Sequence, residues 1–90
     1  MSRTDPHRPD SLIDASGLSC GALEPLLWES MRVLEGGQIL EVRSDFPATR
    51  EGVPSWCWLT GNALVAMITD DPVRTRFFLR KQITPAFGDQ

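Results

Sequence analysis

Two cysteines, Cys20 and Cys57, are the residues of this 90-residue chain best suited to covalent chemistry. A thiolate is a strong nucleophile and can carry a transferable group on its sulfur. The two are too few and too widely spaced for a disulfide framework or a four-ligand zinc site. The single histidine, His7, lies in a polar N-terminal segment, which argues against a hydrolase with a histidine base. The sequence therefore predicts no metal or cofactor, and each cysteine has to be judged by its position.

Cys20 stands at or just before the start of a predicted helix, in the stretch "GLSCGALEP". Free N–H groups and the helix dipole favour an anion there, by about 0.3 to 1 kcal/mol. This is less than the roughly 1.4 kcal/mol that a tenfold change in thiolate population requires. Nearby cations would have to help, and the candidates are Arg50, Arg80 and Lys81. The sequence does not place any of them beside Cys20.

Each cysteine also has a purely structural interpretation. Free cysteine is among the most often buried residue types, so a small packed side chain is the favoured interpretation of Cys20 from residue type alone. Cys57 lies between Trp56 and Trp58 in a segment expected to form a helix over a sheet. We therefore expect Cys57 to be packed and unreactive.

The first half of the domain reads as strand, helix, strand. "SLIDA" (11–15) is a strand candidate, closed by a Ser-Gly turn. Apolar residues recur at helical spacing over 22–34, with Pro25 expected in the first turn and the glycines of "EGG" (35–37) ending the helix. Residues 38–44 alternate between apolar and polar side chains, which predicts a strand with one buried face.

The second half reads as helix, strand, strand. Pro54 is expected to start or kink a second helix that Gly61 ends. Strands are predicted over 62–69 and 73–81, and the "DDP" turn between them favours a hairpin. The order β-α-β-α-β-β predicts an α+β fold, a two-layer sandwich in which two helices cover one face of a four-stranded mixed sheet.

Length and composition set the limits of the domain. We expect a disordered tail over 1–10, one domain over 11–82 and a loose tail over 83–90. The chain shows neither a signal peptide nor an apolar run long enough to span a membrane, which points to the cytoplasm. A net charge of −3 argues against nucleic-acid binding.

Two hypotheses that depend on an exposed aromatic side chain remain open at this point. RNA binding would use Arg74 and Arg76 with Phe78 on an exposed sheet face, although a solvated strand is favoured in so acidic a chain. Trp28 falls beside the apolar stripe of the first helix, where it could anchor a partner or pack at the edge of the sheet.

Three stretches together resemble the TusA/SirA-like sulfur-carrier proteins, also called sulfurtransferases. "DASGLSC" is similar to the family's Asp-x-x-Gly-Leu-x-Cys opening, "FPATREGVPSWC" to its Pro-Ala-Thr turn and aromatic-Cys pair, and "FFLRK" to its closing strand. The resemblance covers about four-fifths of the chain. It implies that Cys20 carries a persulfide, received from a donor such as a cysteine desulfurase and passed to an acceptor protein. The residues that could support the sulfur or its partners are Gly21, Arg50, Arg80 and Lys81.

One departure from the family pattern leaves two hypotheses about function. The family continues its cysteine as Cys-Pro-x-Pro, whereas this chain reads Cys20-Gly21-Ala22-Leu23. The leading hypothesis is a sulfur carrier in which Cys20 transfers sulfane sulfur, with no chemistry performed alone. The alternative is a non-catalytic interaction or regulatory domain that keeps the same fold.

Overall fold

Six elements make up the fold within residues 8–83, the part of the chain that the computed structural model describes. They are β1 (Ser11–Asp14), α1 (Cys20–Val33), β2 (Ile39–Ser44), α2 (Thr49–Thr60), β3 (Ala63–Thr69) and β4 (Thr75–Arg80). Their order is the predicted β-α-β-α-β-β. The predicted α+β fold class is confirmed.

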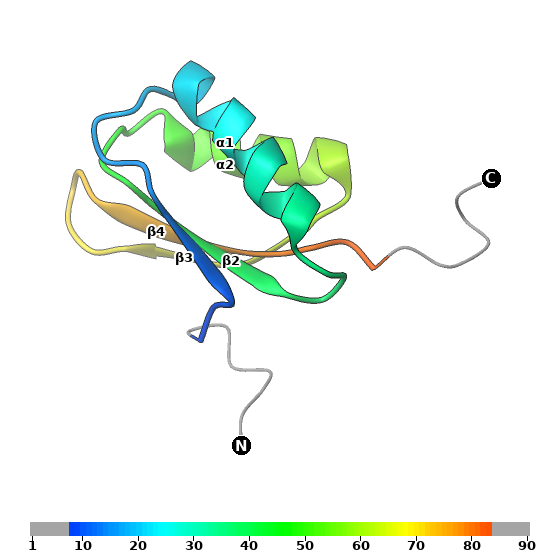
Figure 1. Ribbon diagram of the computed structural model, residues 1–90. Coiled ribbons are helices and arrows are strands. Elements are labelled where there is room, and N and C mark those ends of the chain that lie inside the picture. Colours follow the sequence, from blue (N-terminus) through cyan, green and yellow to red (C-terminus); the bar gives the residue numbers. More distant parts are fainter. Residues whose placement is uncertain (1–7, 84–90) are drawn as a thin grey trace.

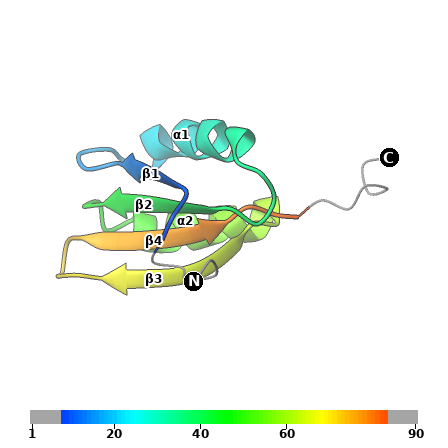
Figure 2. The ribbon, with the colours of Figure 1, turned by 60° about the horizontal axis from the view of Figure 1, so that its bottom comes forward.

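The four strands form one mixed sheet in the order β1-β2-β4-β3 (Figure 2). β1 and β2 are parallel, and β4 is antiparallel to both β2 and β3. Because β1 and β2 are parallel, their carboxyl ends lie at the same end, or edge, of the sheet. Each of these two strands then leads into a helix. Both helices therefore begin at that same edge (Figure 1).

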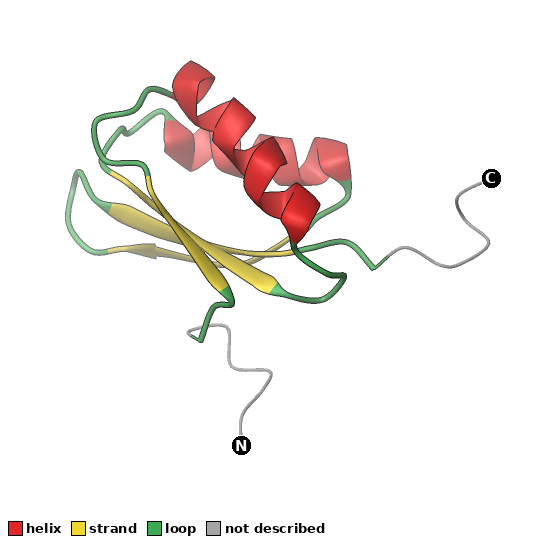
Figure 3. Cartoon of the chain, in the orientation of Figure 1, coloured by secondary structure: helices red, strands yellow, loops and turns green. Residues whose placement is uncertain are grey.

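The two helices lie side by side on one face of the sheet (Figures 1 and 3). Helix periodicity places Leu23, Leu27 and Met31 of α1 toward the sheet, and all three are buried. α2 contributes Val53, Trp56 and Cys57. The strands supply Leu40, Val42, Phe77 and Leu79 to this layer. This single apolar layer holds α1 and α2 in fixed positions over the sheet.

The first helix begins two residues earlier than predicted. Ser19 caps it, and its Oγ accepts the backbone N–H of Ala22 at 3.3 Å, so Cys20 is the first helical residue. Pro25 consequently lies in the second turn rather than the first. The helix ends at Val33 with Leu34 in an extended conformation, and the left-handed glycine is Gly37 in the following turn. The prediction that "EGG" itself stops the helix was therefore wrong in detail.

The second helix begins at Thr49, not at Pro54. Its start depends on contacts with the preceding turn: Thr49 Oγ1 lies 2.6 Å from the carbonyl oxygen of Phe46 and 2.9 Å from Ser44 Oγ. Pro54 is accommodated inside the helix. Gly61 ends it in the left-handed conformation, with φ of 81°, as predicted.

The hairpin of β3 and β4 is confirmed, but its strands are shorter than predicted. Asp71 Oδ1 accepts the N–H groups of Val73 and Arg74, which keeps both residues in the turn. These two hydrogen bonds lower the pKa of Asp71, and the bond from the Arg74 N–H has the larger effect.

The face without helices is only partly the wet face that the alternation predicted: Asp14, Arg43 and Arg80 on it are exposed, but its aromatic residue is not. Phe78 lies on it with only 1% of its surface exposed. Arg76 donates to both carboxylate oxygens of Asp70, at 3.0 Å each. The exposed aromatic and basic face that RNA binding would require is therefore not formed by these residues.

The predicted tails fall mainly on residues 1–7 and 84–90, which lie outside the described part of the chain. Within it, β1 begins at Ser11, where the strand was predicted to begin, and Asp10 just before it also contacts β2. Asp10 donates its N–H to the carbonyl oxygen of Ile39 at 2.8 Å, and its Oδ2 accepts the N–H of Ile39 at 2.8 Å. Asp10 thus prolongs the pairing of β1 with β2.

Candidate functional site

The loop that leads from β1 to Cys20 is held by two carboxylates. Asp14 Oδ1 accepts from the Oγ and the N–H of Ser16, at 2.8 and 3.2 Å, and the first of these bonds is the main reason that the pKa of Asp14 is lowered. Gly17, with a left-handed φ of 84°, donates its N–H to Asp45 Oδ1 at 2.9 Å. Hydrogen bonds therefore hold the loop in place, both within it and to Asp45, the residue after β2.

Cys20 is the first residue of α1 and is half-buried. Its Sγ lies against Gly52, in the first turns of α2: a Cβ placed on Gly52 would stand 2.5 Å from that sulfur. The thiol is thus located between the N-terminal turns of α1 and α2. The geometry keeps one side of the sulfur against α2 and leaves the other accessible.

A groove of about 380 Å³ opens beside the thiol, between α1 and α2. Cys20, Gly21 and Gly52 line it together, and Glu24 is the other ionisable side chain among its described lining residues. The apolar part of the lining consists of Leu23, Leu27, Val53, Trp56 and Leu59. An incoming group can therefore reach Cys20 along a mostly apolar channel.

Arg50 lies at the Cys20 end of the molecule, but its guanidinium binds elsewhere. Nε donates to Thr75 Oγ1 at 2.8 Å, and Nη2 donates to the carbonyl oxygens of Asp71 and Pro72, at 3.2 and 2.6 Å. Arg50 therefore fastens the start of α2 to the β3–β4 turn. The structure gives it an anchoring contact rather than one with the thiol.

Arg80 and Lys81 lie at the opposite edge of the sheet from Cys20. Arg80 is paired with Ile39, the first residue of β2, and Lys81 Nζ donates to the carbonyl oxygen of Leu34 at 2.6 Å, just beyond the end of α1. α1 has 14 residues, so these groups are about 20 Å from its beginning. Of the four predicted supporting residues, only Gly21 lines the groove with Cys20.

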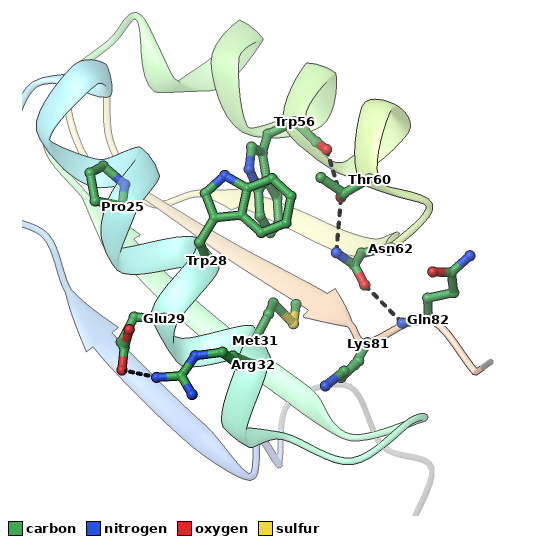
Figure 4. A pocket seen from close by; sticks show the side chains of 10 residues that line it. All are labelled: Pro25, Trp28, Glu29, Met31, Arg32, Trp56, Thr60, Asn62, Lys81 and Gln82. Atoms are coloured by element: carbon green, nitrogen blue, oxygen red, sulfur yellow. Dashed lines mark hydrogen bonds and ion pairs between the residues drawn. The ribbon is translucent and has the colours of Figure 1, made fainter. Parts of the chain in front are cut away.

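Lys81 instead lines a second pocket, of about 410 Å³, toward the far end of the helix pair (Figure 4). Trp28 and Trp56 form one wall of it, with ring centroids 5.4 Å apart and planes at 80°. Trp28 is 54% exposed. Trp28 therefore packs edge-to-face against Trp56, and about half of its surface stays exposed to solvent. It is packed against the fold, as one interpretation held, and it also has exposed surface, as the partner-anchor interpretation requires.

Cys57 is packed, as expected. It is 2% exposed, and burial raises the pKa of its thiol to about 11. Gly52 was missed in the sequence, where Pro54 was expected either to start or to kink the second helix. A glycine at a helical position, where alanine is more stable, was the available signal.

The chemistry open to this site is limited and specific. A half-exposed thiol at a helix N-terminus, beside an apolar groove, can accept and release a group on its sulfur. Across residues 8–83 there is no cluster of three or more His, Cys, Asp or Glu side chains that could hold a metal ion. Within the same residues, no helix has the length and apolar character to cross a membrane. The fold and site define a small α+β protein with a single accessible thiol.

Comparison with known proteins identifies the family. Residues 11–81 match the family described as "Sulfurtransferase TusA". The chain is 31% identical over 74 residues to proteins named "Sulfur carrier protein TusA" from Pseudomonas putida strains F1 and KT2440, covering 82% of this chain and 91% of each relative. A third relative of that name, from strain GB-1, matches to the same extent. The chain belongs to the TusA family of sulfur carriers.

Proposed function

We propose that Cys20 accepts sulfane sulfur as a persulfide and passes it to a partner protein. In the first step the Cys20 thiolate attacks the terminal sulfur of a donor persulfide. An S–S bond forms at Cys20, the S–S bond of the donor breaks, and the donor sulfur leaves as a thiolate that takes up the proton lost by Cys20. The acceptor thiolate then attacks the outer sulfur in the same way, so sulfur moves without net oxidation.

The observation that carries this proposal is the position of the Cys20 sulfur. It is half-exposed, lies at the first turns of two helices and borders a groove between them. Membership of a family whose characterised relatives are named sulfur carriers supports the same chemistry.

The partners are a sulfur donor such as a cysteine desulfurase and a downstream sulfur acceptor, acting in the cytoplasm where thiols stay reduced. Docking would be transient, because a carrier has to leave each partner after transfer. Gly21 lines the same groove, and a Cβ added there would have no neighbour within 4 Å, so a side chain at this position would project into open space.

Intact mass spectrometry tests the proposal directly. The purified protein is incubated with a persulfide donor, and we expect a gain of one sulfur atom that disappears on reduction. The gain should be absent in Cys20→Ser and retained in Cys57→Ser, the matched control. Loading that persists in Cys20→Ser and is lost in Cys57→Ser would refute the assignment.

The second candidate is a non-catalytic interaction or regulatory domain. It is favoured by two exposed apolar side chains on α2, Trp58 at 82% and Leu59 at 75% exposure, and by the Cys-Gly-Ala-Leu departure from the family motif. The same experiment separates the two functions. A protein that binds a donor in a pull-down but never gains sulfur on Cys20 would be the interaction domain.

A further inference from the structure

Gly52 is a glycine whose backbone does not require glycine. It lies inside α2, and it is not among the glycines with positive φ, which are Gly17, Gly37 and Gly61. Glycine in a helix interior is less stable than alanine, because it loses more conformational entropy on folding. An explanation based on backbone conformation is therefore excluded for this position.

The space around Gly52 supplies the explanation. A Cβ on this residue would lie 2.5 Å from Cys20 Sγ and 3.9 Å from Cys20 Cβ. Non-bonded heavy atoms settle at about 3.5 to 4.0 Å, so the first contact is impossible with the sulfur in its present place. Both atoms that an added Cβ would meet belong to Cys20, and the missing side chain of Gly52 is the space that the thiol uses.

We propose that Gly52 is a positioning residue for Cys20, a role that rests on the proposed function of this thiol. The absent Cβ forms a notch in α2 that receives Sγ. This holds the sulfur against the first turns of both helices and in the lining of the groove. A side chain at position 52 turns the thiol into another staggered rotamer, which moves the sulfur by about 3 Å.

Two properties of Gly52→Ala test this role. Iodoacetamide should alkylate Cys20 about 2- to 10-fold faster in the variant, because the sulfur leaves the shelter of α2. Persulfide loading from a protein donor should become slower, because the sulfur no longer lies along the groove. An alkylation rate equal to that of the wild type would overturn the proposal.

A double-mutant comparison separates positioning from a general effect on folding. Gly52→Ala should raise the melting temperature when Cys20→Ala has removed the sulfur, and should lower it or leave it unchanged when Cys20 is present. Gly21→Ala is the matched glycine substitution: its Cβ would have no neighbour within 4 Å, so its effect should be the same in both backgrounds.

The remaining outcomes are also decisive. If Gly52→Ala does not fold but Gly52→Ala/Cys20→Ala does, the steric relation is supported. If both fail to fold, or if Gly52→Ala shifts the melting temperature equally in both backgrounds, the relation is refuted. Neither the alkylation rate nor the melting temperature depends on persulfide transfer. Failure of the proposed function would appear in the loading experiment alone.

Discussion

The two cysteines of this protein share a residue type and differ in everything that controls reactivity. Cys20 begins a helix, is half-buried and lines a groove. Cys57 lies inside α2 on the side facing the sheet, with 2% of its surface exposed and a thiol pKa raised to about 11 by burial. Both belong to the helix layer, so reactivity here follows from position along a helix and the direction the side chain faces. The comparison makes four predictions.

The largest expected difference is the rate of alkylation in the native protein. At pH 8 a thiol with a pKa of about 11 is ionised in roughly one molecule in a thousand. Since Cys57 is also inaccessible, iodoacetamide should modify Cys20 at least about 100-fold faster. Peptide mapping by mass spectrometry measures both rates, and in denaturant the two should become similar. Equal rates in the native protein would remove the basis of the comparison.

At alkaline pH the stability of the fold should fall because of Cys57. Between about pH 9 and pH 11 the unfolded Cys57 has lost its proton while the folded one retains it. The unfolded state then binds fewer protons, so the free energy of unfolding falls as pH rises, by up to about 1.4 kcal/mol per pH unit. Urea denaturation across this range measures the slope. The slope should become smaller in Cys57→Ala, and an unchanged slope would contradict the assignment.

The start of α2 should affect Cys20 more than Cys57. Thr49→Val removes a buried hydroxyl that contacts Phe46 and Ser44, which should cost about 1 to 2 kcal/mol and loosen the turns around Gly52. Hydrogen exchange and Cys20 alkylation should both become faster. Thr60→Val, which removes a hydroxyl at the other end of α2, is the control. If Thr60→Val accelerates Cys20 alkylation as much, the effect is not local.

The smallest effect is expected at Lys81. Lys81→Met removes the hydrogen bond to the Leu34 carbonyl and should cost about 1 kcal/mol of stability. Because this contact lies at the far edge of the sheet, Cys20 alkylation should stay within about twofold of the wild-type rate. A larger fall in the Cys20 rate would show that Lys81 acts on the thiol despite its position.

The order and type of the elements could be predicted because they follow from local sequence patterns. Helical spacing in α1, alternation in β2 and the turn residues between β3 and β4 each act over a few neighbouring residues. The helix starts were less predictable, because they depend on specific hydrogen bonds. α2 begins at Thr49 through contacts with Phe46 and Ser44, and no rule about Pro54 contains that information.

The burial of Phe78 was missed for a related reason. Alternation along β4 correctly puts it on the face opposite Phe77, and Phe77 packs in the core beneath the helices. Alternation describes which side of the sheet a residue occupies. It does not describe what covers that side, and with 1% exposure Phe78 is covered.

The sequence by itself determined the family, the order of the elements and Cys20 as the candidate thiol, since all three follow from short motifs and local periodicity. Only the tertiary structure decided which residues surround that thiol. The parallel strands β1 and β2 bring the first turns of both helices to one edge, which places Gly52 against Cys20. The antiparallel strand β4 carries Arg80 and Lys81 to the opposite edge, although the sequence offered them as neighbours of the sulfur. Strand direction, a property of chain pairing rather than of any local segment, separates these two outcomes.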